Sequence, residues 1–354
     1  MRDRMCLFGR PVCPEEALVD CIQDIEVESL GHGGWRLGWQ PNFSARAVAV
    51  YWGPQPDAID PTALVSGAHG TAELRLPAAC VRPYFELVAE DGARIVVAER
   101  QVPLVGGVNF RDLGGYQTRQ GTRLRWGRLF RSGHMSRLTA ADQTLLTALG
   151  IRTVCDFRMA EERANENATL SCEPTLETLG IPPGLKDRFF LHRLFEQTDD
   201  PAVVVEAMHE IMRSLILECA PHYARLFDAL LGAADGSVLM NCSAGKERTG
   251  VGAALLLLAL GVPRTTILYD FALSRRYFPA ASELPRAREK YNVQERPGRD
   301  VEALMAPLLF TRESYLEAVF GVIDERYGDD DRFLRQAMGV GEPERARLRD
   351  RFTS

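Results

Sequence analysis

The hydrophobic pattern of this chain changes its period once, at about Gly106. Before that point, apolar residues alternate in short runs that are separated by turn signals such as Gly53-Pro54 and Asp91-Gly92. A period of two is typical of half-buried strands, so a small all-β sandwich is predicted for this half. The predicted strands are Ile25–Leu30, Trp35–Trp39, Ala47–Trp52, Ala72–Leu76, Tyr84–Ala89 and Arg94–Val102.

After Gly106, helical periods alternate with short, continuously apolar runs. The predicted buried strands are Ile151–Phe157 and Ser237–Asn241. The predicted helices are Thr139–Leu149, Ala202–Leu217, Tyr223–Leu231, Thr249–Leu260, Thr265–Arg276, Arg312–Tyr327 and Asp331–Met338. Strands that alternate with helices favour an α/β fold, with a mostly parallel central sheet flanked by helices.

Two domains follow from this change of pattern. We expect an N-terminal β-sandwich over residues 1–103 and an α/β domain over residues 104–354, with Gln101–Val105 as the linker. The apolar stretch Phe189–Phe195 has two interpretations: it packs in the core, or it belongs to a lid or recognition surface.

Composition excludes several classes of protein. Hydrophobic residues make up 46% of the 354 residues and charged residues 25%, an ordinary globular mixture. The longest apolar run, Val251–Val262, is shorter than the roughly 20 residues that a membrane span needs. A net charge of −6 provides no basic field that would attract nucleic acid. The N-terminus has no apolar stretch of secretory length, so a cytoplasmic location is expected, with secretion by a signal-independent route left open.

Cysteine and lysine usage adds two expectations. The 8 cysteines form no Cys-x-x-Cys pair and no zinc-like spacing with histidine, so neither a metal nor a cofactor is expected. Among the 42 basic residues, only Lys186, Lys246 and Lys290 are lysines, so a lysine at a special place is informative.

One segment, between a predicted strand and a predicted apolar helix, carries the chemistry. It reads Asn241-Cys242-Ser243-Ala244-Gly245-Lys246-Glu247-Arg248-Thr249-Gly250. The backbone N–H groups of a tight loop that runs into a helix N-terminus converge on one point and favour a tetrahedral oxyanion. The same positive potential stabilises a thiolate, and an arginine at the helix start can bind two phosphate oxygens. The threonine hydroxyl is placed to hydrogen-bond the sulfur.

Two other interpretations of this segment are weaker. A nucleotide-binding Walker loop does not fit, because Glu247 follows Gly245-Lys246 and Met240 occupies the place of the first glycine. A buried structural cysteine with a surface arginine nearby would explain Cys242 and Arg248 alone. The preceding strand, the following helix and the glycine of the loop together favour a phosphate site.

The segment resembles the HCxxGKDRTG signature of the cysteine-dependent protein phosphatases. More narrowly, it is similar to the bacterial atypical tyrosine-phosphatase family typified by the secreted mycobacterial tyrosine phosphatase B. Four further boxes resemble that family, and they are Gly107–Gly115, Gly127–Gly133 followed by Leu138-Thr139, Cys155–Arg158 with Glu161, and Asp270–Ser274 after Gly261-Val262-Pro263. The resemblance covers about residues 103–350, whereas the strand pattern of residues 1–100 is similar to a fibronectin-type-III module.

The resemblance implies a role for each residue of the loop. Cys242 is the nucleophile and Arg248 the phosphate binder, while a loop lysine such as Lys246 goes with activity on phosphoinositides as well as phosphotyrosine in related phosphatases. Glu247 stands where the family has an aspartate that serves as general acid. The residues implied in phosphate binding are Ser243, Ala244, Gly245, Lys246, Glu247, Arg248 and Thr249.

Three questions stay open at this stage. Asp156 is a second candidate for the general acid, or else a strand-end carboxylate paired with Arg158 or Arg131. Asn241 replaces the family's histidine and carries no charge, so the thiolate would be less stabilised than in the family. Arg111, Arg131 and Arg158 either line the pocket or form structural salt bridges.

The expected protein is a phosphoric monoester hydrolase of the protein-tyrosine-phosphatase type. It would form a phosphocysteine intermediate and act on phosphotyrosine, with dual specificity or phosphoinositide activity also open. The alternative is a catalytically weakened relative that serves as a phospho-ligand binding module. Expected partners are a phosphorylated protein or phospholipid substrate, and inorganic phosphate or vanadate in the site, with no nucleic acid.

Overall fold

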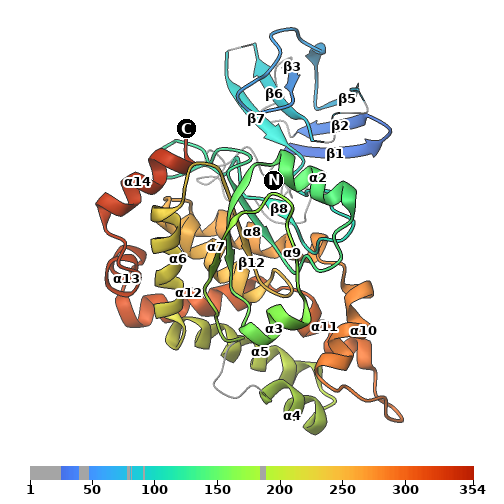
Figure 1. The fold of residues 1–354 in the computed structure, drawn as a ribbon, viewed down its shortest axis with the longest axis vertical. Helices are drawn as coiled ribbons and strands as arrows, with labels where there is room; N and C mark the ends of the chain where they lie inside the picture. The colour runs from blue at the N-terminus through green and yellow to red at the C-terminus, as the bar shows by residue number, and fades with distance from the viewer. Residues whose placement is uncertain (1–24, 40–47, 78–79, 81, 91, 184–188) are drawn as a thin grey trace, which may run out of the picture. The chain divides into compact units, whose positions relative to one another are not determined.

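The computed structural model describes residues 25–39, 48–77, 80, 82–90, 92–183 and 189–354 (Figure 1). The leader segment, Ala47, Asp91 and Lys186 therefore lie outside the described residues. The chain divides into two compact units. One comprises the chain up to Val102 together with Asp112–Arg128 and Ser354, and the other comprises Pro103–Arg111 and Leu129–Thr353.

The first unit contains two antiparallel sheets, as the alternating pattern predicts. In one sheet, β2 (Gly34–Trp39) pairs with β1 (Ile25–Gly31) and β5 (Thr71–Arg75). In the other, the order is β4 (Val65–Ala68), β3 (Val48–Gly53), β6 (Tyr84–Ala89) and β7 (Arg94–Ala98). The sequence analysis missed β4, which has only four residues and no alternating pattern.

Alternate side chains of these strands form the core of the first unit. Trp35 and Leu37 of β2 are buried, and the ring of Trp35 lies 6.0 Å from that of Phe85 in the other sheet. The last strand, β7, ends at Ala98 rather than at the predicted Val102. Beyond it, Arg100 donates hydrogen bonds to the carbonyl oxygens of Asp112 and Gly114, which lie in the same unit.

The segment Asp112–Arg128 returns to the first unit, although the predicted boundary lies at residue 103. Its Asp112 carboxylate forms a fully buried ion pair with Arg82, at 2.7 Å. The same carboxylate accepts hydrogen bonds from the backbone N–H groups of Gly114 and Gly127. Periodicity cannot reveal this return, because the segment is held by individual polar contacts rather than by a repeating apolar face.

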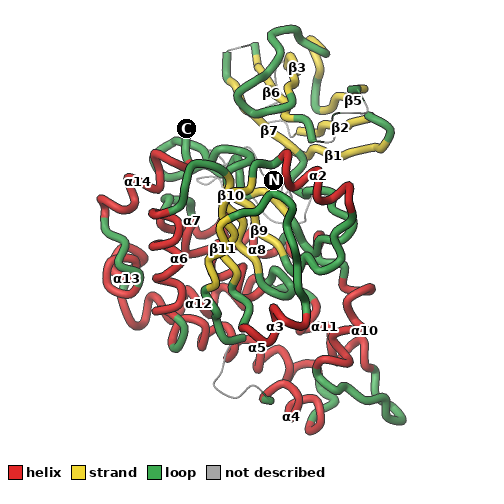
Figure 2. The backbone as a smooth tube through the Cα atoms, viewed as in Figure 1, coloured by secondary structure: helices red, strands yellow, loops and turns green. Residues whose placement is uncertain are grey.

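The second unit is built on a sheet with the strand order β11-β10-β12-β9-β8. Strands β11 (Thr175–Thr178), β10 (Ile151–Asp156), β12 (Ser237–Asn241) and β9 (Leu129–Ser132) are parallel neighbours, and the short β8 (Arg111–Asp112) lies at the edge. Asn241 lies opposite both Asp156 and Ser132, so three strands end together at one edge of the sheet. This confirms the predicted mostly parallel sheet flanked by helices (Figure 2).

Every segment predicted as helical in this unit contains helix. The first of these helices along the chain is α2 (Ala140–Ala148), and Thr139 is its N-cap, as predicted. The other helices are α3 (Ala160–Asn165), α4 (Phe190–Gln197), α5 (Pro201–Leu217), α6 (Ala220–Gly232), α7 (Glu247–Ala259), α8 (Arg264–Ala272), α9 (Ser274–Tyr277), α10 (Ala280–Lys290), α11 (Val301–Leu309), α12 (Glu313–Tyr327), α13 (Asp330–Ala337) and α14 (Glu342–Phe352). Among the described residues, no helix is long and apolar enough to cross a membrane.

The helix predictions fail in two ways. The single helix predicted over Thr265–Arg276 is two helices, α8 and α9, which meet at Leu273. Helices α3, α4, α10, α11 and α14 were not predicted. Pro285 lies inside α10 and Pro307 inside α11, and an internal proline argues against a helix when only the sequence is known.

The buried ion pair of the first unit provides a stability test. Asp112→Asn leaves the charge of Arg82 buried without its partner, so the unfolding free energy should fall by about 3 kcal/mol. Glu28→Gln removes an exposed partner of Arg36 and should cause no measurable loss. Urea denaturation followed by tryptophan fluorescence measures both. Equal stabilities of the two variants would contradict a structural role for the Asp112 contact.

Candidate active site

The candidate nucleophile lies in the loop between the central strand β12 and the buried helix α7. Strand β12 ends at Asn241, Cys242 follows directly, and α7 begins at Glu247. Gly245 has a φ of +70°, which favours glycine. A Cβ there would approach Gly133 N to 2.4 Å, so a larger residue would push the loop away from the end of β9.

Residues that lie outside the loop donate hydrogen bonds to its backbone carbonyl groups and fix them in place. The Gly245 oxygen accepts from Asn109 Nδ2 and from Arg131 Nη2, both at 2.9 Å. The Ser243 carbonyl oxygen accepts from the backbone N–H of His134 at 2.8 Å. The Gly245 N–H donates to Sγ of Cys242 at 3.2 Å, so a backbone dipole faces the sulfur as the sequence predicts.

Two of the arginines predicted near the pocket support the loop instead. Arg131 pairs with Asp270 at 2.6 Å, and Arg111 donates to the Asp270 carbonyl and to Ser274. Both arginine side chains are fully buried and neither is among the described residues that line the pocket. Of the two roles that the sequence left open for them, the structure shows the structural one.

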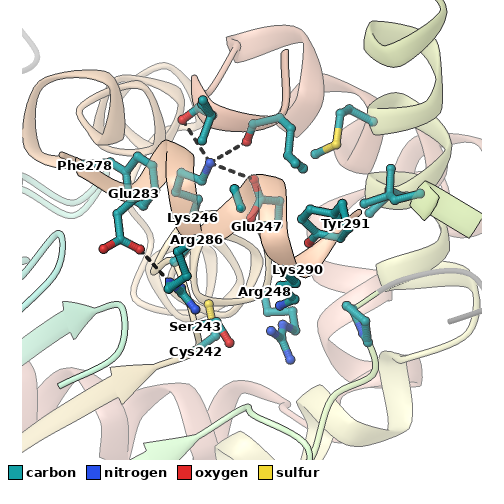
Figure 3. A pocket seen from close by; sticks show the side chains of 18 of the residues that line it. Cys242, Ser243, Lys246, Glu247, Arg248, Phe278, Glu283, Arg286, Lys290 and Tyr291 are labelled. Atoms are coloured by element: carbon teal, nitrogen blue, oxygen red, sulfur yellow. Dashed lines mark hydrogen bonds and ion pairs between the residues drawn. The ribbon is translucent and has the colours of Figure 1, made fainter. Parts of the chain in front are cut away.

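Cys242 opens into a cavity of about 170 Å³ (Figure 3). One wall is formed by residues of the loop, namely Cys242, Ser243, Ala244, Lys246, Glu247 and Arg248. Apolar side chains from several helices form others, including Phe190 and Leu191 of α4 and Leu308 of α11. The stretch predicted as either core or recognition surface thus does both, because Phe195 of the same helix is buried.

Arg248 is held by a carboxylate that the sequence analysis missed. Its two terminal nitrogens donate to the two oxygens of Glu162 in α3, both at 2.7 Å. Ser243 Oγ donates to the same carboxylate at 2.8 Å. The family-like box was read as ending at Glu161, one residue too early, and the spacing Asp-x-Arg-x-x-x-Glu would have pointed to Glu162.

Charges around Glu162 keep it ionised. Burial alone would raise the pKa of this carboxyl, but hydrogen bonds and the positive charge of Arg248, with Lys290 nearby, hold the pKa well below its usual range. Lys290 Nζ lies 3.7 Å from Glu162 Oε1. The pair therefore presents Arg248 as a fixed cation beside Cys242.

Three residues of the segment make contacts that the sequence does not reveal. Thr249 Oγ1 donates towards the Ser132 carbonyl at 3.5 Å rather than to the sulfur, and Thr249 is not among the described residues that line the cavity. Lys246 Nζ donates to backbone carbonyls of α11. The side-chain amide of Asn241 is buried and makes no hydrogen bond with the described residues.

The two predicted acids have different surroundings. Both oxygens of Asp156 accept from Arg158, and Asp156 is not among the described residues that line the cavity. Arg158 thus forms a structural salt bridge, which was one of the two roles predicted for it. Glu247 lines the cavity and is 20% exposed, with Lys246 Nζ 3.7 Å away.

A third carboxylate, Glu283 of α10, also lines the cavity. It pairs with Arg286 at 2.8 Å and lies 3.5 Å from His134. Burial would raise the pKa of Glu283, but hydrogen bonds and charges from His134 and Arg286 lower it to about 2. Glu283 is therefore ionised at neutral pH and has no proton to donate. No cluster of three potential metal ligands occurs among the described residues.

Comparisons with known proteins agree with this site. The model of the tyrosine phosphatase family matches residues 102–354. A Cupriavidus necator protein named as a tyrosine-protein phosphatase is 34% identical over 241 residues, which are 66% of this chain and 82% of that protein. The triple specificity protein phosphatase PtpB of Mycobacterium tuberculosis is 30% identical over 298 residues, with 72% of this chain and 98% of that protein covered.

More distant likenesses add little. A tyrosine-protein phosphatase of Nostoc commune is 27% identical over 224 residues, covering 63% of this chain and 73% of that protein. The crystal structure of P. aeruginosa TpbA covers 53% of this chain and 90% of that one, with 18% identity and a TM-score of 0.24.

A fold with a central parallel sheet and a family match over residues 102–354 define a hydrolase of the protein-tyrosine-phosphatase type. The chain belongs to the tyrosine phosphatase family. The match confirms the resemblance of the loop and its accompanying boxes. It does not reach residues 1–101, so the fibronectin-like nature of that part stays a prediction.

The Glu162–Arg248 pair predicts a pH-dependent stability. A carboxylate whose pKa falls on folding stabilises the protein above its unfolded pKa, about 4.3 for glutamate, and loses that effect as the pH falls further. Glu162→Gln should cost about 3 kcal/mol at pH 7, because Arg248 stays buried without its partner. The difference from the wild type should shrink between about pH 4 and pH 2.

Urea denaturation at several pH values measures this difference. Glu161→Gln is the matched control, since Glu161 is the exposed neighbour on the same helix. A deficit for Glu162→Gln that is constant with pH, or shared by Glu161→Gln, would contradict the assigned contact.

Proposed function

We propose that this phosphatase hydrolyses phosphotyrosine through a phosphocysteine intermediate on Cys242. The observation that carries the proposal is the cavity that Cys242 and Arg248 both line, with the Gly245 N–H 3.2 Å from the Cys242 sulfur. A thiolate, a backbone dipole and a fixed cation at one point suit phosphoryl transfer, which depends mainly on positioning and charge.

In the first step, the Cys242 thiolate attacks phosphorus and forms an S–P bond. The ester P–O bond breaks, and the leaving oxygen takes its electron pair and a proton from the general acid. In the second step, water attacks phosphorus and gives up a proton to the same carboxylate. The S–P bond then breaks, which releases inorganic phosphate and restores the thiolate.

Glu247 is the acid that this proposal favours. Of the carboxylates considered, Asp156 is committed to Arg158, and Glu283 is held ionised by its neighbours. Glu247 lines the cavity, is partly exposed and makes one ion pair, at 3.7 Å. Its side chain is one methylene longer than the family's aspartate, so its carboxyl reaches further from the backbone towards the leaving group.

The cavity itself supports an aromatic substrate. Its volume of about 170 Å³ suits a phenyl ring, and Phe190, Leu191 and Tyr291 contribute apolar surface. Aromatic side chains stabilise a bound ring by edge-on or offset stacking. The substrate proposed for the site is therefore a phosphotyrosine side chain of a protein.

Cys242→Ser should abolish turnover of aryl phosphates but leave vanadate binding within about threefold of wild type. The loop N–H groups and Arg248 remain in this variant, and vanadate stands in for the pentacoordinate phosphoryl group in transfer. Arg248→Lys should lower kcat/KM by about 10²–10³-fold, because an ammonium cannot replace the bidentate fork. Steady-state kinetics and vanadate titration measure these effects.

If the Cys242→Ser variant still hydrolyses aryl phosphates, Cys242 is not the nucleophile. If pure wild-type protein binds vanadate but hydrolyses no aryl phosphate, the protein is instead a phospho-ligand binding module.

Glu247→Gln should slow esters of poor leaving groups by about 10²–10⁴-fold. It should hardly affect p-nitrophenyl phosphate, whose leaving group needs little protonation. Glu247→Asp should retain activity, because it restores the residue of the related phosphatases. Asp156→Asn is the comparison: a dependence on the leaving group that appears there and not in Glu247→Gln would transfer the acid role to Asp156.

A further inference from the structure

Lys246 lies in the middle of the catalytic loop, yet its side chain points away from the loop's N–H groups. Its ammonium donates to the backbone carbonyl oxygens of Leu308 and Leu309, at 2.6 and 2.9 Å. It lies 4.3 Å from the centre of the Phe278 ring and 3.7 Å from Glu247 Oε1. The residue is only 3% exposed.

The two acceptors belong to the last turn of α11. Carbonyl groups there have no partner within the helix, and the helix dipole makes that end favourable for a cation. An ammonium carries three tetrahedral donors and no acceptor, and two of the three are used on these carbonyls. The face of the Phe278 ring and the carboxylate of Glu247 lie against the same ammonium and stabilise its positive charge.

Moving this ammonium to a bound phosphate would be costly. Two carbonyl groups of α11 would lose their donor in a buried place, and Glu247 would lose its cation. Arg248, by contrast, is already fixed beside Cys242 by Glu162 and needs no help from Lys246. Of the two cations of the loop, Arg248 is thus the one held beside Cys242, and Lys246 is engaged by α11 and Glu247.

We propose that Lys246 is a positioning residue, which joins the catalytic loop to the end of α11 and holds the Glu247 carboxyl at the edge of the cavity. This inference rests on the proposed role of Glu247 as the acid. Lys246 then contributes to proton transfer and not to phosphate affinity.

The test compares Lys246→Met and Lys246→Arg with the wild type on aryl phosphates of graded leaving-group pKa. For Lys246→Met, kcat on the poorest leaving group should fall by about 10²-fold, the cost of misplacing a reacting group by about 1 Å. On p-nitrophenyl phosphate, kcat should change little, and vanadate inhibition should stay within threefold. Lys246→Arg should show the same loss of kcat on poor leaving groups as Lys246→Met, because a planar guanidinium does not fit a site built for a compact ammonium.

Two results would overturn the proposal. One is a weakening of vanadate inhibition by tenfold or more in Lys246→Met that Lys246→Arg restores, which would make Lys246 a phosphate ligand. The other is an equal loss of kcat on all leaving groups, which would make its effect independent of the acid.

Arg345→Met is the matched control for lost stability. Arg345 donates to the carbonyl of Ala259 at the other end of α7 and pairs with Asp331. Its replacement should lower the thermal midpoint without changing the dependence of kcat on the leaving group. If Lys246→Met does not fold, Lys246→Arg alone decides, by its leaving-group dependence and its vanadate inhibition.

A double-mutant cycle with Glu247→Gln separates this inference from the proposed function. If Lys246 acts through Glu247, adding Lys246→Met to Glu247→Gln should cause no further loss on poor leaving groups. If Glu247→Gln alone shows no dependence on the leaving group, the proposed acid is wrong and the inference falls with it. If the two effects multiply in full, only the inference about Lys246 is wrong.

Discussion

The bidentate pair between Arg248 and Glu162 is the interaction on which the site depends. It joins the first turn of α7 to α3, which follows β10, so it ties together the elements that follow two neighbouring strands. A buried guanidinium is tolerated only when a carboxylate compensates its charge. Because the pair fixes the direction of the guanidinium, Arg248 is held beside Cys242 by the protein itself, and substrate binding need not order it.

The rest of the loop is held by close backbone contacts. Gly245 and Gly133 lie against each other, with no room for a Cβ on either, and Arg131 and Asn109 bind the loop's carbonyl groups from behind. These contacts leave the N–H of Gly245 directed at the sulfur. Positive charge near Cys242 therefore comes from a preorganised backbone as well as from Arg248, which suits a site where no metal is invoked.

Much of this arrangement could be predicted from the sequence. A buried strand, a short loop with glycine and a strongly apolar helix place Cys242 and Arg248 at one edge of a parallel sheet, and the structure has this order. The walls of the cavity could not be predicted in this way. Helices α4, α10 and α11, which line the cavity, are distant in sequence from the loop. Pro285 lies inside α10 and Pro307 inside α11, and an internal proline argues against a helix in a prediction from sequence.

The sequence leaves the roles of several cations near the site open for one physical reason. Arg111, Arg131, Arg158 and Lys246 were candidates for phosphate contact because they are cations near the motif. In the structure each is occupied by a carboxylate or by backbone carbonyls. Sequence shows charge but not its partner, so it cannot separate a cation that binds substrate from one that holds the loop. Glu162, the partner that matters most, lies one residue beyond the position assigned from the motif.

Chemical trapping of the intermediate tests the central claim most directly. The wild-type enzyme would be mixed with an aryl phosphate, quenched during turnover, digested and analysed by mass spectrometry. The proposed mechanism predicts a phosphoryl group on the peptide that contains Cys242, bound to its sulfur. Turnover with that peptide unmodified, or with the phosphoryl group on another side chain, would contradict it.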